Sequence, residues 1–245
     1  MSGLAIDDAA WSSAWRWRSP TDKLLLCLGL VVCASVLPAW PGDVLVGATA
    51  TALALGPARV PPRIFGRAVR LPMTFIALGT VTAVLSIDDG GIGWAPDAAE
   101  RAGSLAGSAL AGSTAVLLLA TTTPISDLLP ALRRLGVPAA VVEVASVVYR
   151  LVFVLLDSLR TIREAQTARM GYSSLRRTYR SSGALAAAVL TRSWDRARRL
   201  QEGLAGRGME TGLRVLPEVL PSSWVFLGAT ALGVGAIVSV SVALS

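Results

Sequence analysis

Histidine is absent from this 245-residue sequence, lysine occurs only at Lys23, and cysteine occurs only twice. Without histidine, the chain has no imidazole to act as a general base or a metal ligand. Cys27 and Cys33 lie six residues apart in one apolar run, so on a helix they point to different sides and cannot pair with each other. Charged residues make up 16% of the chain and hydrophobic residues 53%. Because a soluble domain contains roughly 25% charged residues, this composition predicts a membrane protein.

Motifs for nucleotide hydrolysis and covalent catalysis are also missing. The sequence has neither a glycine-rich phosphate-binding loop ending in lysine nor a serine flanked by glycines in the hydrolase pattern. We therefore expect a protein that is not an enzyme, with no catalytic, cofactor-binding or metal-ligating residues and no bound cofactor.

The net charge of +7 is distributed unevenly along the chain. Residues 150–214 hold 13 arginines and five acidic residues, which gives about +8, while the rest of the chain sums to about −1. A near-neutral apolar body therefore carries one arginine-rich segment. This asymmetry indicates a binding interface on that segment.

Five apolar runs are candidate membrane spans: residues 24–40, 44–56, 69–87, 103–121 and 224–244. All but the short run at 44–56 approach the roughly 20 residues needed to cross a bilayer. The predicted fold class is an all-α polytopic membrane protein with about five transmembrane helices and three cytoplasmic coupling helices inserted before the last span. The expected domains are an N-terminal membrane domain of four spans (1–122), a cytoplasmic coupling domain (123–220) and a C-terminal transmembrane helix (221–245).

Charges in the short loops predict the orientation. A cytoplasmic N-terminus puts residues 1–23 and 57–68 inside, and these segments contain Arg16, Arg18, Lys23, Arg59, Arg63 and Arg67. The outside loop at residues 88–101 is acidic, so the distribution follows the positive-inside rule. We therefore expect a multi-pass protein of the cell inner (plasma) membrane with its N-terminus and coupling domain in the cytoplasm.

Three amphipathic helices are predicted after the fourth span. The first covers residues 124–135, with Thr123 as its N-cap, and stops at Gly136. The second covers residues 138–169 and the third residues 183–207.

Charged side chains recur on two of these helices. Glu143, Arg150 and Asp157 are spaced by seven residues, which places them on one face of the second helix. Structural ion pairing is one interpretation of these groups, and a direct role in transport or coupling is the other. On the third helix, an arginine stripe adjoins an apolar stripe; the arginines include Arg192, Arg196 and Arg199.

The second and third helices end in arginine close to glycine. The endings are Ala168, Arg169, Met170, Gly171 and Gly206, Arg207, Gly208. A left-handed glycine ends a helix and leaves the side chain of the preceding arginine free. This arginine can then form two parallel hydrogen bonds with a carboxylate of another protein. Ordinary compensation of the helix dipole is the alternative explanation.

Five strings occur in the order seen in a known family. They are Thr-Thr-Pro-Ile-Ser-Asp-Leu-Leu at 122–129, Leu135-Gly136-Val137-Pro138, Tyr149-Arg150, Glu164-Ala165-Gln166 with Ala168-Arg169, and Arg207-Gly208. Over essentially its whole length, the chain resembles the transmembrane T component of energy-coupling factor (ECF) transporters. Its opening resembles the cobalt-uptake branch, CbiQ, at Ile6-Asp7, Ala9-Ala10, Ser19-Pro20 and Lys23-Leu24-Leu25.

The resemblance implies a non-catalytic scaffold with several partners. Two cytoplasmic ABC-type ATPases, as a homo- or heterodimer, bind two Ala-Arg-Gly motifs of the family, and a separate S component in the membrane captures the substrate. By position, the ATPase-coupling residues are Ala168, Arg169, Met170, Gly171, Gly206, Arg207 and Gly208. Residues expected to support the coupling helices are Glu143, Arg150, Asp157, Arg192, Arg196 and Arg199. The chain departs from the motifs where Met170 replaces a glycine and Gly206 an alanine.

Other interpretations remain open on the sequence alone. The resemblance also admits a T component for nickel or a vitamin. A stand-alone transporter would need charged or polar residues inside the spans, yet residues 69–87, 103–121 and 224–244 contain only one charged residue, the terminal Arg70. A membrane-surface anchor would bind anionic lipid through its arginines. We expect contact with the lipid bilayer and none with nucleic acid, because aromatic residues for base stacking are missing.

Overall fold

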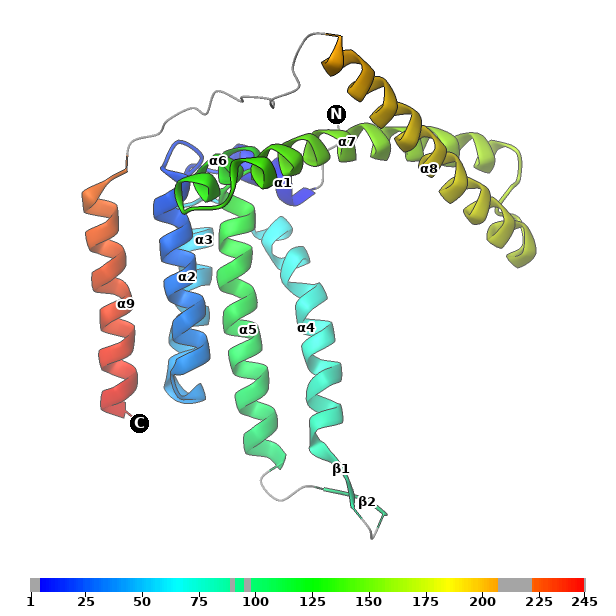
Figure 1. Ribbon diagram of the computed structural model, residues 1–245. Helices are drawn as coiled ribbons and strands as arrows, with labels where there is room; N and C mark the ends of the chain where they lie inside the picture. Colours follow the sequence, from blue (N-terminus) through cyan, green and yellow to red (C-terminus); the bar gives the residue numbers. More distant parts are fainter. Residues whose placement is uncertain (1–4, 89–90, 95–97, 207–221, 245) are drawn as a thin grey trace. The chain divides into compact units, whose positions relative to one another are not determined.

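The computed structural model describes residues 5–88, 91–94, 98–206 and 222–244 (Figure 1). The chain divides into two compact units. Unit 1 comprises Met1–Ala131 and Glu218–Ser245, and unit 2 comprises Leu132–Pro217.

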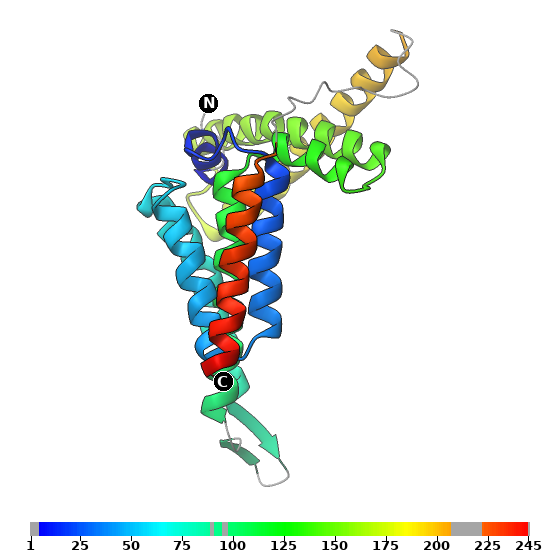
Figure 2. The same ribbon diagram turned by 90° about the vertical axis from the view of Figure 1, so that its left-hand side faces the viewer.

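Unit 1 is a bundle of apolar helices. It contains α1 (Ala5–Ser12), α2 (Pro20–Val36), the wide turn η1 (Ala39–Asp43), α3 (Val44–Leu55), α4 (Pro62–Val84), α5 (Ala98–Thr122) and α9 (Trp224–Leu244). Figures 1 and 2 show α2, α3, α4, α5 and α9 running side by side. The central helix is α5, which contacts α2, α3 and α4, while α9 packs on α2 and η1.

Small side chains allow α3 and α5 to pack closely. Ala50 and Ala54 of α3 and Ala111 and Ala115 of α5 are at most 2% exposed. Alanine at a helix interface lets two backbones approach, which favours association in a bilayer where the hydrophobic effect between helices is weak. Larger buried side chains complete the core; they include Leu30, Val46, Leu118 and Ile237.

Polar side chains join three helix ends at one end of this bundle. Lys23 is 1% exposed, and its Nζ donates hydrogen bonds to the carbonyl oxygens of Trp15 (3.1 Å) and Thr122 (3.0 Å). The Asp22 carboxylate accepts from Ser222 Oγ (2.6 Å) and from the backbone N–H of Ser223 (2.9 Å). The start of α2, the end of α5 and the start of α9 therefore meet here, at what we call the Lys23 end.

Within the described residues, four helices are long and apolar enough to cross a membrane: α4 over Pro62–Thr82, α5 over Glu100–Thr122, α7 over Ala139–Ala168, and α9. Two shorter helices, α2 with 17 residues and α3 with 12, cover the other predicted spans. The predicted all-α polytopic class is confirmed. The number of spans remains a prediction, as does the cytoplasmic placement of α7.

Two boundaries differ from the prediction. The helix α4 already begins at Pro62, so Arg63 and Arg67 lie on a helix rather than in a loop. Residues 85–87, predicted to be helical, instead belong to β1 (Leu85–Asp88), which pairs antiparallel with β2 (Gly91–Trp94), Leu85 opposite Trp94. Both segments alternate apolar with small or polar residues, which is a pattern typical of strands.

Unit 2 consists of long helices. The first, α6 (Ile125–Arg134), begins in unit 1, and α7 (Ala139–Ala168) and α8 (Leu175–Ala205) follow. Gly136, with φ 98°, confirms the predicted end of α6. The predicted N-cap at Thr123 is wrong, because its buried Oγ1 has no hydrogen-bond partner among the described residues, and the Pro124 carbonyl accepts the first amides instead.

The helix α8 begins eight residues earlier than predicted. Its N-cap is Ser174, whose hydroxyl accepts from the backbone N–H of Arg177 (3.4 Å). The prediction treated Gly183 as a boundary, but this glycine lies inside the helix with no neighbouring atom close to where a Cβ would stand. A single exposed glycine lowers helix stability by only about 1 kcal/mol and does not end a helix.

Candidate functional site

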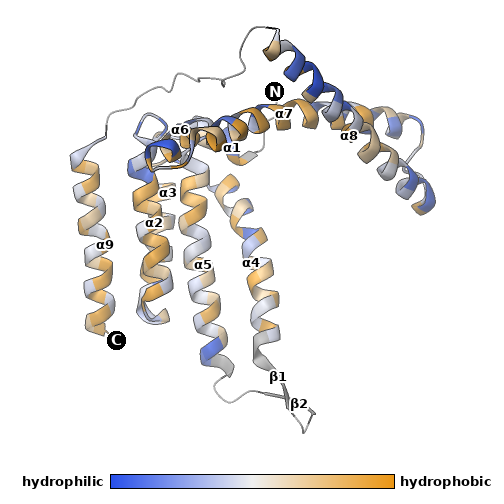
Figure 3. Cartoon of the chain, in the orientation of Figure 1, coloured by the Kyte–Doolittle hydropathy of each residue, from blue (hydrophilic) through white to orange (hydrophobic). Residues whose placement is uncertain are grey.

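The arginine-rich segment of unit 2 is built on the pair α7 and α8, which contact each other. Figure 3 shows that the first half of α7 is hydrophobic, whereas α8 is hydrophilic toward its C-terminal end. Among the described residues of α8, none is buried. The chain reverses direction between the helices at residues 164–181, which we call the elbow.

The end of α7 is a complete Schellman motif. The backbone N–H of Met170 donates to the Thr167 carbonyl (3.0 Å), and that of Gly171 donates to the Gln166 carbonyl (2.8 Å). Met170 is the left-handed residue, with φ 58°. The prediction that glycine would take this conformation is therefore wrong for this helix, because Met170 occupies the left-handed position itself.

Gly171 is needed at the elbow for a different reason. A Cβ at this position would lie 2.8 Å from the Gln166 carbonyl oxygen and 2.8 Å from Ser181 Oγ. The first of these atoms belongs to the backbone of α7 and cannot move aside cheaply. The close approach of α8 to the end of α7 therefore depends on a missing side chain.

Side chains of the elbow connect α7 to α8. Gln166 Nε2 donates to the Ser181 carbonyl (3.2 Å), and Ser181 Oγ donates to the Gly171 carbonyl (2.9 Å). Tyr172 OH donates to Gln166 Oε1 (2.7 Å), which fixes the orientation of the Gln166 amide. Sequence reasoning missed these roles, although Gln166 belongs to one of the strings that carried the family resemblance. The only feature of the sequence that pointed to these roles is the position of Gln166, two residues before the end of a predicted helix.

Arg169 is one of the exposed cations of the elbow and lies at the end of α7. It is the C-cap of α7, and its backbone N–H donates to the Ala165 carbonyl (3.3 Å). Its side chain is exposed and makes no salt bridge with a described residue. A guanidinium that is held at a fixed backbone position and left unpaired can receive a carboxylate in bidentate geometry.

The second arginine motif is only partly visible. Gly206 is the C-cap of α8 with a right-handed backbone (φ −63°, ψ −16°), so it does not end the helix in the left-handed conformation. Arg207 and Gly208 lie outside the described residues.

The three charged residues spaced by seven on α7, Glu143, Arg150 and Asp157, form no salt bridges with one another. Asp157 is 3.7 Å from Arg160, one turn further along an exposed surface. Glu143 and Arg150 form no salt bridge with any residue in the described ranges. Residues seven positions apart are about 10 Å apart along a helix, which is too far for a direct ion pair. This arrangement leaves Glu143 and Arg150 available to another chain.

The predicted arginine and apolar stripes of α8 are both exposed. Arg192, Arg196 and Arg199 are exposed, and so are Leu190 (69%) and Trp194 (73%) on the apolar stripe. A salt bridge between Arg198 Nε and Glu202 Oε1 (3.0 Å), which was not predicted, runs along the same helix. An exposed apolar stripe beside a cationic one is typical of a surface that binds another protein.

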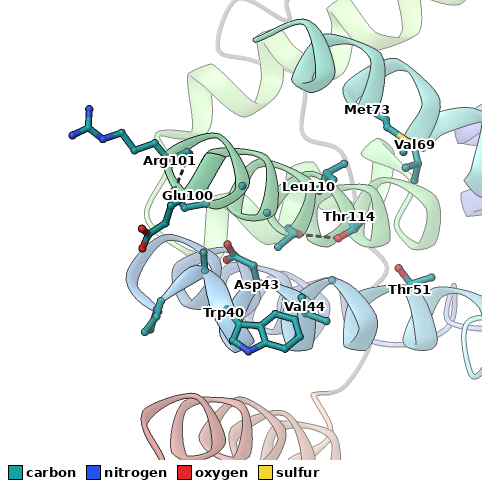
Figure 4. Close-up of a pocket in the computed structure, with 17 residues that line it drawn as sticks. Trp40, Asp43, Val44, Thr51, Val69, Met73, Glu100, Arg101, Leu110 and Thr114 are labelled. Atoms are coloured by element: carbon teal, nitrogen blue, oxygen red, sulfur yellow. Dashed lines mark hydrogen bonds between the residues drawn. The ribbon is translucent and has the colours of Figure 1, made fainter. Parts of the chain in front are cut away.

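Unit 1 contains a cavity of about 1070 Å³ between η1, α3, α4 and α5 (Figure 4). Asp43, at the end of η1, is only 3% exposed, and its Oδ2 accepts a hydrogen bond from Ser108 Oγ of α5 (2.7 Å). Asp43 Oδ1 is buried without a hydrogen-bond partner among the described residues. A Cβ on Gly107 would lie 2.9 Å from Asp43 Oδ2, so glycine is needed where this carboxylate meets α5. This polar contact ties η1 to the central helix.

Comparison with known proteins gives consistent matches. A family model described as a cobalt transport protein, CbiQ, matches residues 12–218. A cobalt transport protein CbiQ from Rhodobacter capsulatus is 40% identical over 228 residues, covering 93% of each chain. A cobalt transport protein CbiQ from Salmonella typhimurium is 31% identical, covering 78% of this chain and 90% of its own. A protein from Methanocorpusculum labreanum, named for a fusion as CbiMQ, is 28% identical over 87% of this chain and 37% of its own.

Proposed function

The chain belongs to the CbiQ family of cobalt transport proteins, and from this premise we propose that it is the energy-coupling transmembrane subunit of an ECF-type ABC importer for cobalt. The family and the apolar helices establish a multi-pass membrane component of a cobalt transporter. In the proposed complex, two cytoplasmic ABC-type ATPases bind unit 2, and a separate S component in the membrane captures the ion.

The observation that carries this proposal is the elbow with its exposed Arg169. Backbone and side-chain hydrogen bonds fix the end of α7 against α8, while the Arg169 guanidinium faces solvent. A rigid element that presents an unpaired cation suits a contact that must transmit force. The exposed apolar and arginine stripes of α8 extend the same surface and add area for an ATPase.

A separate S component is supported by the sequence and by one relative. The chain has no histidine and only two cysteines, so it offers few of the nitrogen and sulfur ligands that transition metals favour. The relative named CbiMQ is a fused protein of which this chain covers only 37%. We propose that the corresponding substrate-binding protein is a separate chain here, and that the complex lies in the inner membrane with unit 2 in the cytoplasm.

Reversing the charge of the two motif arginines tests the docking role. We expect Arg169→Glu with Arg207→Glu to reduce ATPase co-purification by more than tenfold while membrane insertion is unchanged. The matched control is Arg133→Glu with Arg134→Glu, because both residues are exposed in unit 2, lie outside the elbow and α8, and undergo the same change of charge. ATPases that co-purify equally with both double variants would refute the proposal, as would cobalt flux through the chain reconstituted alone.

A further inference from the structure

A second group of arginines lines a cavity at the start of α4, within unit 1. The cavity measures about 660 Å³, and its wall includes Ile6 of α1 and Arg63, Arg67, Arg70 and Leu71 of α4. All three arginines are exposed, and none forms a salt bridge with a carboxylate in the described part of the chain. None of the three therefore has a salt-bridge partner within the described chain.

The arginines continue into an apolar stripe along the same helix face. Arg63, Arg67 and Arg70 are spaced by four and three residues, so they share one face over about 10 Å of helix. Leu71 and Phe75 extend the row of Arg63 and Arg67 at intervals of four residues, and Leu78 follows three residues later. These apolar side chains are 79%, 78% and 64% exposed, in that order. One helix face therefore presents three cations followed by roughly 10 Å of apolar surface.

Aromatic residues at this end of the bundle are typical of the boundary between membrane and water. Arg16 stacks on Trp11 (4.0 Å) and Trp17 (4.9 Å), and these tryptophans are 43% and 66% exposed. The Ser13 hydroxyl donates to the Ala58 carbonyl (3.0 Å), which ties the segment after α1 to the segment before α4. Exposed tryptophan rings of this kind lie at the level of lipid headgroups.

Electrostatics at this site favour an anion. The segments that meet here contain six arginines: Arg16, Arg18, Arg59, Arg63, Arg67 and Arg70. Within these segments the acidic residues are Asp7 and Asp8 of α1, so the arginines are in excess. Anionic lipid headgroups are attracted to basic pockets of this kind.

We propose that the first turns of α4 bind an anionic phospholipid. Its phosphate lies on Arg63, Arg67 and Arg70, and its acyl chains follow Leu71, Phe75 and Leu78. Free inorganic phosphate would contact the arginines alone. An acidic peptide would not contact an apolar stripe that faces lipid. The site involves neither the elbow nor α8, so it is independent of the proposed ATPase contact.

Native mass spectrometry of the full-length protein in detergent tests this site. The chain is titrated with phosphatidylglycerol and, in parallel, with phosphatidylcholine of the same acyl chains. We expect the wild type to retain phosphatidylglycerol preferentially. The triple variant Arg63→Gln, Arg67→Gln, Arg70→Gln should bind it roughly 10- to 100-fold more weakly, given the contribution of each basic residue near an anionic lipid surface.

A matched triple variant controls for the loss of charge. Arg192→Gln, Arg196→Gln, Arg199→Gln removes three exposed arginines from α8 and should leave phosphatidylglycerol binding within about twofold of wild type. Equal loss in both triple variants would overturn the proposal, because it would show a general charge effect. The proposal would also be overturned if millimolar inorganic phosphate displaced the lipid. A third contrary result would be an α4 triple variant that binds the lipid normally but no longer binds another transporter subunit.

Discussion

Met170 provides a direct test of how the elbow is built. Its left-handed backbone, with φ 58°, closes the Schellman motif in which the backbone N–H groups of Met170 and Gly171 bond to the end of α7. Replacing Met170 by glycine keeps both hydrogen bonds and removes the Cβ that opposes this conformation. We therefore expect Met170→Gly to stabilise the elbow.

The size of the gain follows from two opposing effects. A left-handed residue with a Cβ costs roughly 1–2 kcal/mol, and glycine loses roughly 0.5–1 kcal/mol more backbone entropy on ordering. Because the Met170 side chain is 65% exposed, removing it sacrifices little packing. The net gain is about 0.5–1 kcal/mol, which corresponds to roughly two- to fivefold less frequent local opening.

Hydrogen–deuterium exchange of the full-length protein in detergent measures this opening. The Met170→Gly protein should exchange the amides of the elbow about two- to fivefold more slowly than wild type, and amides in the middle of α5 should not change. Met170→Ala is the matched control, because it removes the same side chain and keeps the Cβ. Equal exchange in the glycine and alanine variants would refute the claim that strain at this position limits the elbow.

Three further substitutions probe contacts in both units. Gly171→Ala should open the elbow, because its Cβ would lie 2.8 Å from a backbone oxygen, whereas Gly183→Ala should not, because no atom lies near its Cβ position. Hydrogen–deuterium exchange of the elbow amides measures the opening in both variants. Lys23→Met, which removes both buried hydrogen bonds at the end of α5, should lower stability by about 1–3 kcal/mol and reduce the melting temperature in detergent. Gly107→Ala should also reduce the melting temperature, because its Cβ would approach a carboxylate oxygen at 2.9 Å, and Asp43→Ala in the same chain should restore part of the loss.

The apolar runs of unit 1 were predictable from the sequence because composition alone determines them. All five predicted runs overlap helices of the structure: α2, α3, α4, α5 and α9. The start of α4 was not predictable by that reasoning, because Arg63 and Arg67 look like loop residues when only hydropathy is read. In the structure they are exposed on one helix face, where their polarity does not oppose helix formation.

The elbow was predictable only in outline. Glycine and arginine near residue 170 indicate a helix end, and a helix end is present at Ala168. Gly171 must lack a Cβ for two reasons: a Cβ would lie 2.8 Å from the Gln166 carbonyl oxygen, and it would lie 2.8 Å from Ser181 Oγ, ten residues further along the chain. Contacts of this kind arise from how α8 returns against α7, and no local pattern encodes them.

These contacts determine what an ATPase bound at Arg169 would move. Gln166 and Gly171 hydrogen bond to Ser181, so the end of α7 and the first two turns of α8 are joined beside the arginine. A displacement applied to Arg169 would therefore shift both helices together instead of bending the end of α7 alone. On α7, the exposed and apolar Val141, Val144 and Val148 lie about 30–40 Å from Arg169 at 1.5 Å per residue. Within unit 2, the proposed contact point is thus connected to a long apolar helix surface, which could contact another protein of the proposed complex.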